Sequence, residues 1–189
     1  MTHVEKPLAA ARMFIGRCNL KGQQVVDATA GNGHDTVFLA QCVGVNGRVI
    51  AFDIQKEALS SAKKRLIEND LVDRVDLVLS GHEHAEKYVK GDIAAAMFNL
   101  GYLPGGNHSI TTCPEKTVKA LDVLINKLTP GGIITLVAYS GHSGGLKEKK
   151  DVIAYCSKLP QNRFTVLSYG IMNQINNPPS LLVIEKHKY

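Results

Sequence analysis

Glycines and acids in the first third of the chain form the clearest chemical pattern. Val25-Val26 leads through small residues into the turn Gly31-Asn32-Gly33, and a helical pattern follows from His34 to Gln41. Small residues let a ligand approach the backbone, and a turn that opens a helix presents free N–H groups. Asp53 follows about 20 residues later, the spacing at which a doubly wound fold offers a carboxylate to ribose hydroxyls. This pattern predicts a site for an adenosine-containing cofactor.

Asp27 and Thr36 indicate which cofactor this is. A dinucleotide site has a third glycine where this chain has Thr36. Asp27 would repel a pyrophosphate but attract the ammonium group of an amino acid. S-adenosylmethionine has that ammonium group, a ribose and no phosphate, so we expect it to bind at Asp27, Gly31, Asn32, Gly33 and Asp53. A dinucleotide, or a turn with only a structural role, is the alternative, since such a motif alone is weak.

A histidine-containing segment, Ser80-Gly81-His82-Glu83-His84, follows the third predicted strand. His82 is the candidate for contact with the adenine. The alternative is a helix start with Ser80 as its N-cap and exposed histidines. A metal site here would need further ligands that the sequence does not place. The four cysteines contain no CxxC pair, so we predict no metal site.

A polar, glycine-rich loop, FNLGYLPGGNHS over 98–109, begins at the end of the fourth predicted strand. Amine-methylating enzymes carry an Asp/Asn-Pro-Pro-aromatic motif at this place. There, an amide oxygen and a backbone carbonyl bind the hydrogens of the target nitrogen while an aromatic ring packs on the substrate. Asn99 and Tyr102 are candidates for these roles, although Leu100-Gly101 replaces the prolines. The alternative is a surface loop in which Tyr102 only packs.

Tyr139 and His142 follow the fifth predicted strand. Either could contact a substrate or assist proton removal, whereas the alternative is a packed tyrosine and an exposed histidine. Proton removal matters for an amine acceptor, because an alkylamine with a pKa near 10 is almost fully protonated at pH 7. Forming the neutral amine there costs roughly 4 kcal/mol.

Alternating apolar and amphipathic runs predict the elements that position these residues. Apolar runs predict strands near 25–29, 48–53, 75–79, 93–98, 132–138, 163–170 and 180–186. Helical patterns lie near 34–41, 56–69, 83–89, 112–127 and 146–158, with an amphipathic helix near the start of the chain. Strands interleaved with helices predict an α/β, Rossmann-like fold with a mostly parallel seven-stranded sheet. The last two strands lack an intervening helix, so we expect an antiparallel edge hairpin, as in class I methyltransferases.

Composition is typical of one globular domain over 1–189. The chain is 44% apolar and 21% charged, and its net charge of +5 is only weakly suggestive of an RNA partner. The first 20 residues contain no long apolar run, so we expect neither a signal peptide nor a membrane span, and a cytoplasmic location.

Several segments together resemble one methyltransferase family. DATAGNGHDT, AFDIQ, GHE, FNLGYLPGG with SITT, Tyr139-x-x-His142 and YGIMNQINNPP look like the MnmM (YtqB-type) family, long catalogued as rRNA methylases. The resemblance covers nearly the whole chain, and NLGYLPGG and NQINNPP are its most specific parts. It departs at Asn107, where members commonly have aspartate.

The resemblance implies a class I S-adenosylmethionine-dependent tRNA methyltransferase. Such an enzyme methylates the 5-aminomethyl group of a wobble uridine, often 2-thiolated, in the anticodon stem-loop. By position, Asn32, Asp53, Gln55 and His82 would bind the cofactor, and a homodimer is expected. The methyl-transfer site would contain Asn99, Tyr102, Tyr139 and His142. An rRNA or small-molecule methyltransferase, a dinucleotide oxidoreductase and a non-catalytic RNA-binding module are the alternatives.

Overall fold

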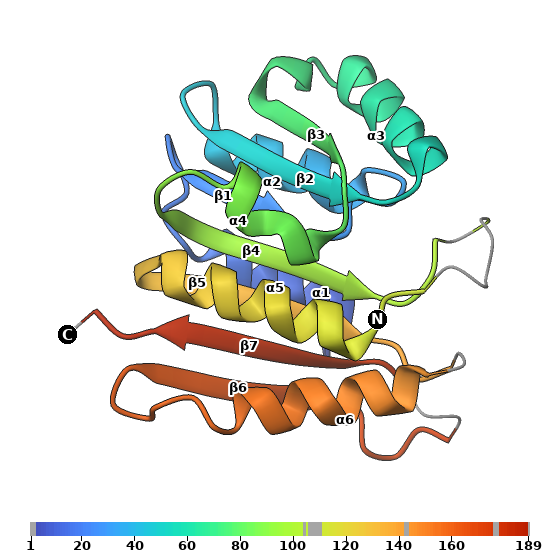
Figure 1. Ribbon diagram of the computed structural model, residues 1–189, viewed down its shortest axis with the longest axis vertical. Helices are drawn as coiled ribbons and strands as arrows, with labels where there is room; N and C mark the ends of the chain where they lie inside the picture. Colours follow the sequence, from blue (N-terminus) through green and yellow to red (C-terminus); the bar gives the residue numbers. More distant parts are fainter. Residues whose placement is uncertain (1–2, 104, 106–110, 142–143, 176–177, 189) are drawn as a thin grey trace.

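A single mixed sheet organises the computed structural model, which describes residues 3–103, 105, 111–141, 144–175 and 178–188. The seven strands lie in the order β3-β2-β1-β4-β5-β7-β6 (Figure 1). β1 to β5 pair in parallel, whereas β7 runs antiparallel to both β5 and β6. The strands are β1 (Gln24–Asp27), β2 (Arg48–Asp53), β3 (Val75–Leu79), β4 (Ile93–Leu100), β5 (Leu128–Ala138), β6 (Phe164–Gly170) and β7 (Ser180–Lys186). The predicted fold class and edge hairpin are therefore confirmed.

Helices cover both faces of this sheet. Val25 belongs to a core cluster that contains residues of α1, α2 and α3, whereas its neighbour Val26 belongs to the cluster on the opposite face, with residues of α4, α5 and α6. This alternation follows from the two-residue period of a strand, and it explains why the central strands are apolar on both faces. The helices are α1 (Pro7–Gly16), α2 (His34–Val43), α3 (Lys56–Glu68), α4 (Ala85–Tyr88), α5 (Pro114–Lys127) and α6 (Gly145–Cys156). Short 3₁₀ turns are η1 (Val72–Arg74) and η2 (His82–His84).

The predicted boundaries differ from the structure mainly beside proline and glycine. β5 begins at Leu128 rather than near 132, although Pro130-Gly131-Gly132 is a sequence typical of a turn. A register shift between Ile93 and Ala95 accommodates this segment within the strand pair. α5 begins at Pro114 rather than at Thr112, because proline suits the first helical position and Cys113 before it is extended.

The fold brings the ends of several strands to one edge of the sheet. The parallel strands β1 to β5 all end at the same edge, so the segments that follow them meet there (Figure 1). Such an edge is where open α/β sheets bind ligands. Among the described residues, no helix combines the length and the apolar character needed to cross a membrane.

Candidate active site

A cavity of about 910 Å³ opens at this edge of the sheet. Segments after five strands contribute to its wall: 28–32, 53–55, 80–83, 99–103 and 139–141. Arg12 of α1 and Asp35 of α2 also line it, as do Pro178 and Pro179 before β7. The cavity is within the size range of small-molecule sites, and its wall contains most of the residues that the sequence singles out.

Asp53 joins the glycine turn to the end of β2. One carboxylate oxygen accepts a hydrogen bond from the backbone N–H of Gly31 at 2.9 Å, and the other accepts one from that of Gln55 at 2.9 Å. A carboxylate can accept about four hydrogen bonds, so two positions remain for ribose hydroxyls. Asp53, Gly31 and Gln55 all line the cavity, as predicted for a cofactor site.

Glycine is needed at the two positions of the turn for different structural reasons. Gly31 has φ +49° and lines the cavity, where a Cβ would stand 3.5 Å from the nearest side-chain atom, which belongs to Leu103. Gly33 lies outside the cavity wall, at φ +83°, and a Cβ there would stand 2.7 Å from the Cα of Ala62. Gly33 thus allows α2 to approach α3, rather than meeting a cofactor directly as the sequence suggests. Asn32 lines the cavity, and its carbonyl accepts a hydrogen bond from Arg65 at 2.9 Å.

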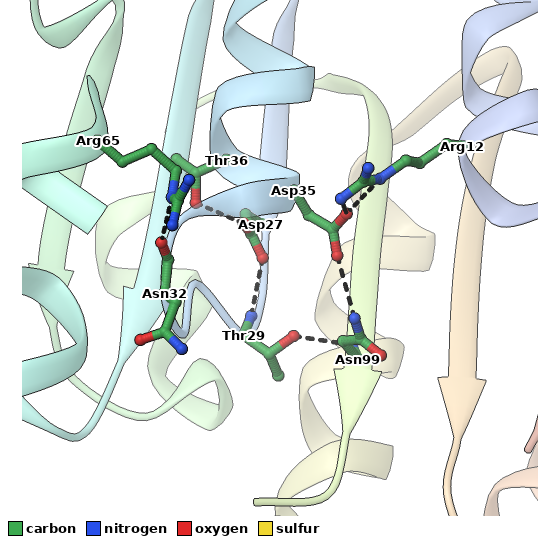
Figure 2. A network of polar contacts seen from close by, with 8 residues as sticks. All are labelled: Arg12, Asp27, Thr29, Asn32, Asp35, Thr36, Arg65 and Asn99. Carbon is green, nitrogen blue, oxygen red and sulfur yellow. Dashed lines mark hydrogen bonds and ion pairs between the residues drawn. The ribbon is translucent and has the colours of Figure 1, made fainter. Parts of the chain in front are cut away.

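Asp27 lies beneath the turn instead of in the cavity wall. It is 1% exposed, and its carboxylate accepts hydrogen bonds from the backbone N–H of Thr29 at 3.1 Å and the hydroxyl of Thr36 at 2.7 Å (Figure 2). Burial, and then the charge of Asp35, raise the pKa of Asp27 to about 7. This placement differs from the predicted direct contact with an ammonium group. Asp27 is the last residue of β1, and its side chain lies in the interior of the protein. Its hydrogen bonds to Thr29 and Thr36 fix the turn that lies between these two residues.

His82 lines the cavity and has a buried hydrogen-bond acceptor. Its Nδ1 lies 3.0 Å from the carbonyl oxygen of Ala28, which can only accept, so Nδ1 carries the hydrogen. Burial lowers the pKa of His82, which keeps the ring neutral at neutral pH. Nε2 therefore retains its lone pair, and it is buried without a hydrogen-bond partner among the described residues. An exocyclic amino group such as that of adenine would supply the missing donor.

Asn99, at the end of β4, is held at two points. Its backbone N–H donates to the hydroxyl of Thr29 at 2.7 Å, and its side-chain Nδ2 donates to Asp35 at 3.1 Å (Figure 2). The amide oxygen, Oδ1, points away from Asp35 and is buried without a partner within the part of the chain that the structure describes. Asn99 thus lines the cavity and holds a buried acceptor that lacks a donor among the described residues, the property expected of a group that receives an N–H of an amine.

Two tyrosines lie in the same cavity wall. Tyr102 follows Asn99 in the loop after β4, and its backbone bridges to Thr111. Tyr139 follows β5, and burial together with the negative charge of Asp35 raises its pKa. Its phenol consequently stays protonated at neutral pH. His142 and Asn107, the other residues considered from the sequence, lie outside the described residues.

Arg12 and Asp35 are site residues that the sequence reasoning missed. Asp35 is 7% exposed in the first turn of α2, and Arg12 reaches it from α1. An acid directly after the glycine turn was a usable signal, but it also suits a helix N-terminus without any ligand. Arg12 offered no such signal, because it lies 23 positions from its partner in the chain.

Relatives with known structures share this fold over their full length. A Clostridium thermocellum protein described as a "putative rRNA-methylase" is 44% identical with a TM-score of 0.95, covering 98% of this chain and 100% of that one. A "putative methyltransferase" from Streptococcus mutans, solved in complex with SAH, is 39% identical with a TM-score of 0.90, covering 97% and 99%.

A curated relative and a family model agree with this likeness. The chain is 38% identical over 164 residues to a "tRNA (mnm(5)s(2)U34)-methyltransferase, chloroplastic" from Arabidopsis thaliana. That match covers 82% of this chain but 60% of the relative, so the chain spans less than two thirds of its length. The family model described as "Putative rRNA methylase" matches residues 49–185. The chain therefore belongs to the rRNA methylase family of S-adenosylmethionine-dependent methyltransferases.

Proposed function

We propose that this chain is a tRNA methyltransferase that N-methylates the 5-aminomethyl group of wobble uridine or 2-thiouridine. The product is 5-methylaminomethyl-(2-thio)uridine. The buried Oδ1 of Asn99 is the observation that carries the proposal, since Asn99 lines the cavity and this oxygen lacks the donor that an amine N–H would supply. The name of the Arabidopsis relative supports the choice of tRNA and of this nucleoside.

The cofactor fits the turn and the strand ends around it. Asp53 retains two acceptor positions for ribose hydroxyls, and His82 Nε2 can accept from the adenine amino group. Gly31, Asn32 and Gln55 complete this part of the wall. When bound, S-adenosylmethionine supplies a methyl group activated by its sulfonium. Asp27 and Gly33 act behind the wall in this proposal, where they fix the turn through Thr29, Thr36 and α3.

The chain's own contribution to methyl transfer is positioning. Asn99 Oδ1 accepts one N–H of the acceptor amine and thereby directs its lone pair, while Tyr102 and Tyr139 pack around the nucleoside. The amine must first lose a proton, because almost all of it is protonated at pH 7. Asn99 cannot take that proton, and Tyr139 stays protonated itself because its pKa is raised. We therefore assign proton removal to His142, directly or through water.

A substrate in rRNA is the second candidate, favoured by the description of the family model. The first experiment separates the two. Purified protein is incubated with S-adenosylmethionine and either rRNA or tRNA that carries 5-aminomethyl-2-thiouridine, and the nucleosides are analysed by mass spectrometry. We expect conversion of the aminomethyl nucleoside to its methylated form. Methylation of rRNA with unchanged tRNA would refute the tRNA proposal.

Replacing Asn99 tests its role within this reaction. Asn99→Ala removes the acceptor oxygen, so we expect kcat to fall about 100-fold, the size of effect seen when one oriented hydrogen bond is lost from a site. Asn126→Ala is the matched control, since Asn126 is exposed on α5 and its side chain, among the residues that the structure describes, bonds only to its own helix. Titration calorimetry should show unchanged SAH affinity for both variants. Full turnover by Asn99→Ala would show that the assignment is wrong.

The cytoplasmic location, the anticodon stem-loop as the recognised part of tRNA and the homodimer remain predictions. Fractionation, footprinting and sedimentation are the respective measurements for them.

A further inference from the structure

Asp35 holds the side chain of Asn99 and is itself held by Arg12. Nε and one terminal nitrogen of Arg12 lie 2.8 and 2.7 Å from the same oxygen of Asp35. The other oxygen of Asp35 lies 3.1 Å from Asn99 Nδ2 (Figure 2). The guanidinium of Arg12 also lies over the ring of Phe38, 5.7 Å from its centre. Each oxygen of the carboxylate thus has a partner from a different element, α1 or β4.

The carboxylate of Asp35 determines the orientation of the Asn99 side-chain amide. An ionised carboxylate has no hydrogen to donate, so the group facing it must be a donor. Nδ2 of Asn99 is such a donor, and Oδ1 is not. Asp35 therefore selects the amide orientation in which Oδ1 points away from it and stays unpaired among the described residues. Without a charged neighbour, an asparagine can present either end, because its two ends have nearly the same shape.

We propose that Asp35, anchored by Arg12, is a positioning residue that fixes the acceptor oxygen of Asn99 toward the amine of the substrate. This inference rests on the proposed function, which makes the substrate an amine. It also makes the site selective for groups that donate hydrogen bonds. A substrate group that can only accept, such as a carbonyl or a ring nitrogen without hydrogen, would face another acceptor there.

Replacing Asp35 by its amide reverses the orientation. In Asp35→Asn, Arg12 can donate to the new amide oxygen, so the new NH₂ group faces Asn99. Asn99 then satisfies that donor only by turning over, which directs Nδ2 toward the substrate amine. The number of hydrogen bonds is kept, so we expect near-normal folding and SAH affinity. We expect kcat to fall about 100-fold with the KM for S-adenosylmethionine unchanged.

An exchange of the two side chains should restore the arrangement. In the double variant Asp35→Asn/Asn99→Asp, the new amide donates to the new carboxylate. That carboxylate keeps a second oxygen for the amine, and Arg12 still has an acceptor. We expect kcat to recover to within about tenfold of the original protein. Such a recovery would show that the single variants are not inactive merely because they misfold. Asn99→Asp alone places two carboxylates together, so we expect it to be poorly active.

The experiment measures kcat and KM on aminomethyl tRNA, SAH affinity and thermal unfolding for the original protein and these variants. Asp76→Asn is the matched control, since Asp76 pairs with Arg48 on the exposed side of β2 and β3, away from the cavity. Arg12→Gln, which removes the guanidinium but keeps a side-chain amide that can donate to Asp35, should lower kcat by about three- to tenfold.

Two results would overturn the inference. One is an original-like kcat in Asp35→Asn, and the other is a double exchange no more active than its single variants although it folds and binds SAH. If Asp35→Asn does not fold, the double exchange decides through its comparison with Asn99→Asp alone, because only the amide at position 35 supplies a donor to the carboxylate at position 99. An original protein that leaves aminomethyl tRNA unchanged would instead contradict the proposed function.

Discussion

Single atoms without partners among the described residues indicate what the cavity accepts. His82 Nε2 and Asn99 Oδ1 are both buried acceptors of residues that line it, whereas the neighbouring acceptors on Asp27, Asp35 and Asp53 are bonded. Leaving a buried acceptor unpaired costs about 1–3 kcal/mol, so a bound ligand with matching donors removes that cost. The adenine amino group and the substrate amine are donors of this kind. At the residue scale, the site is thus complementary to two N–H donors.

Substituting His82 tests the first of these acceptors. His82→Phe keeps a planar ring but removes Nε2, so we expect SAH to bind about five- to tenfold more weakly, the loss of roughly 1 kcal/mol for one hydrogen bond. Titration calorimetry gives the dissociation constants. His84→Phe is the control, because the His84 side chain is 42% exposed and lies outside the cavity wall. Equal SAH affinities for the two variants would contradict a contact between His82 and the cofactor.

At the scale of elements, α2 and α3 determine the backbone path of the glycine turn. α2 begins at His34, directly after Gly33, and α3 packs so close that its backbone at Ala62 leaves no space for a Cβ. Arg65 of α3 also donates to the carbonyl of Asn32. The path of the turn into the cavity therefore depends on α3 as well as on the residues of the turn.

Two glycines with similar backbone angles separate strain from packing. Gly22 has φ +72° with nothing within 4 Å of a Cβ, whereas Gly33 has φ +83° and Ala62 at 2.7 Å. We expect Gly22→Ala to lower the free energy of unfolding by about 1–2 kcal/mol through left-handed strain alone. Gly33→Ala should lose about 1–3 kcal/mol more through the clash. Urea unfolding measures both, and equal losses would contradict the packing role of Gly33.

At the scale of the whole molecule, acids are buried beside the cavity. Asp27 and Asp35 are 1% and 7% exposed, and hydrogen bonds from Thr29 and Thr36 stabilise the buried side chain of Asp27. Folding therefore favours the protonated form of Asp27, whose pKa rises to about 7. This connects the stability of the fold to pH.

The sign of this pH effect follows from proton binding. Between about pH 4 and pH 7, the folded protein holds the Asp27 proton more tightly than the unfolded chain does, so stability falls as pH rises and then levels off. Asp27→Asn cannot ionise: its Oδ1 can accept from the N–H of Thr29, and its Nδ2 can donate to the hydroxyl oxygen of Thr36, which reverses that hydrogen bond. Urea unfolding from pH 5 to pH 8 should show the variant gaining stability relative to the original protein, up to about 3 kcal/mol. A constant difference across this range would contradict the raised pKa.

The sequence by itself determined the order of elements and predicted the place of the cofactor. Apolar runs with a two-residue period and helical patterns depend on neighbours in the chain, as does the interval from Gly33 to Asp53. Only the tertiary structure decided that Asp27 lies behind the turn, that Gly33 faces α3, and that Asn99 is oriented by Asp35 and Arg12. These hydrogen bonds join residues 9 to 64 positions apart and connect separate elements. No local periodicity encodes them, because they arise when packed elements bring distant side chains together.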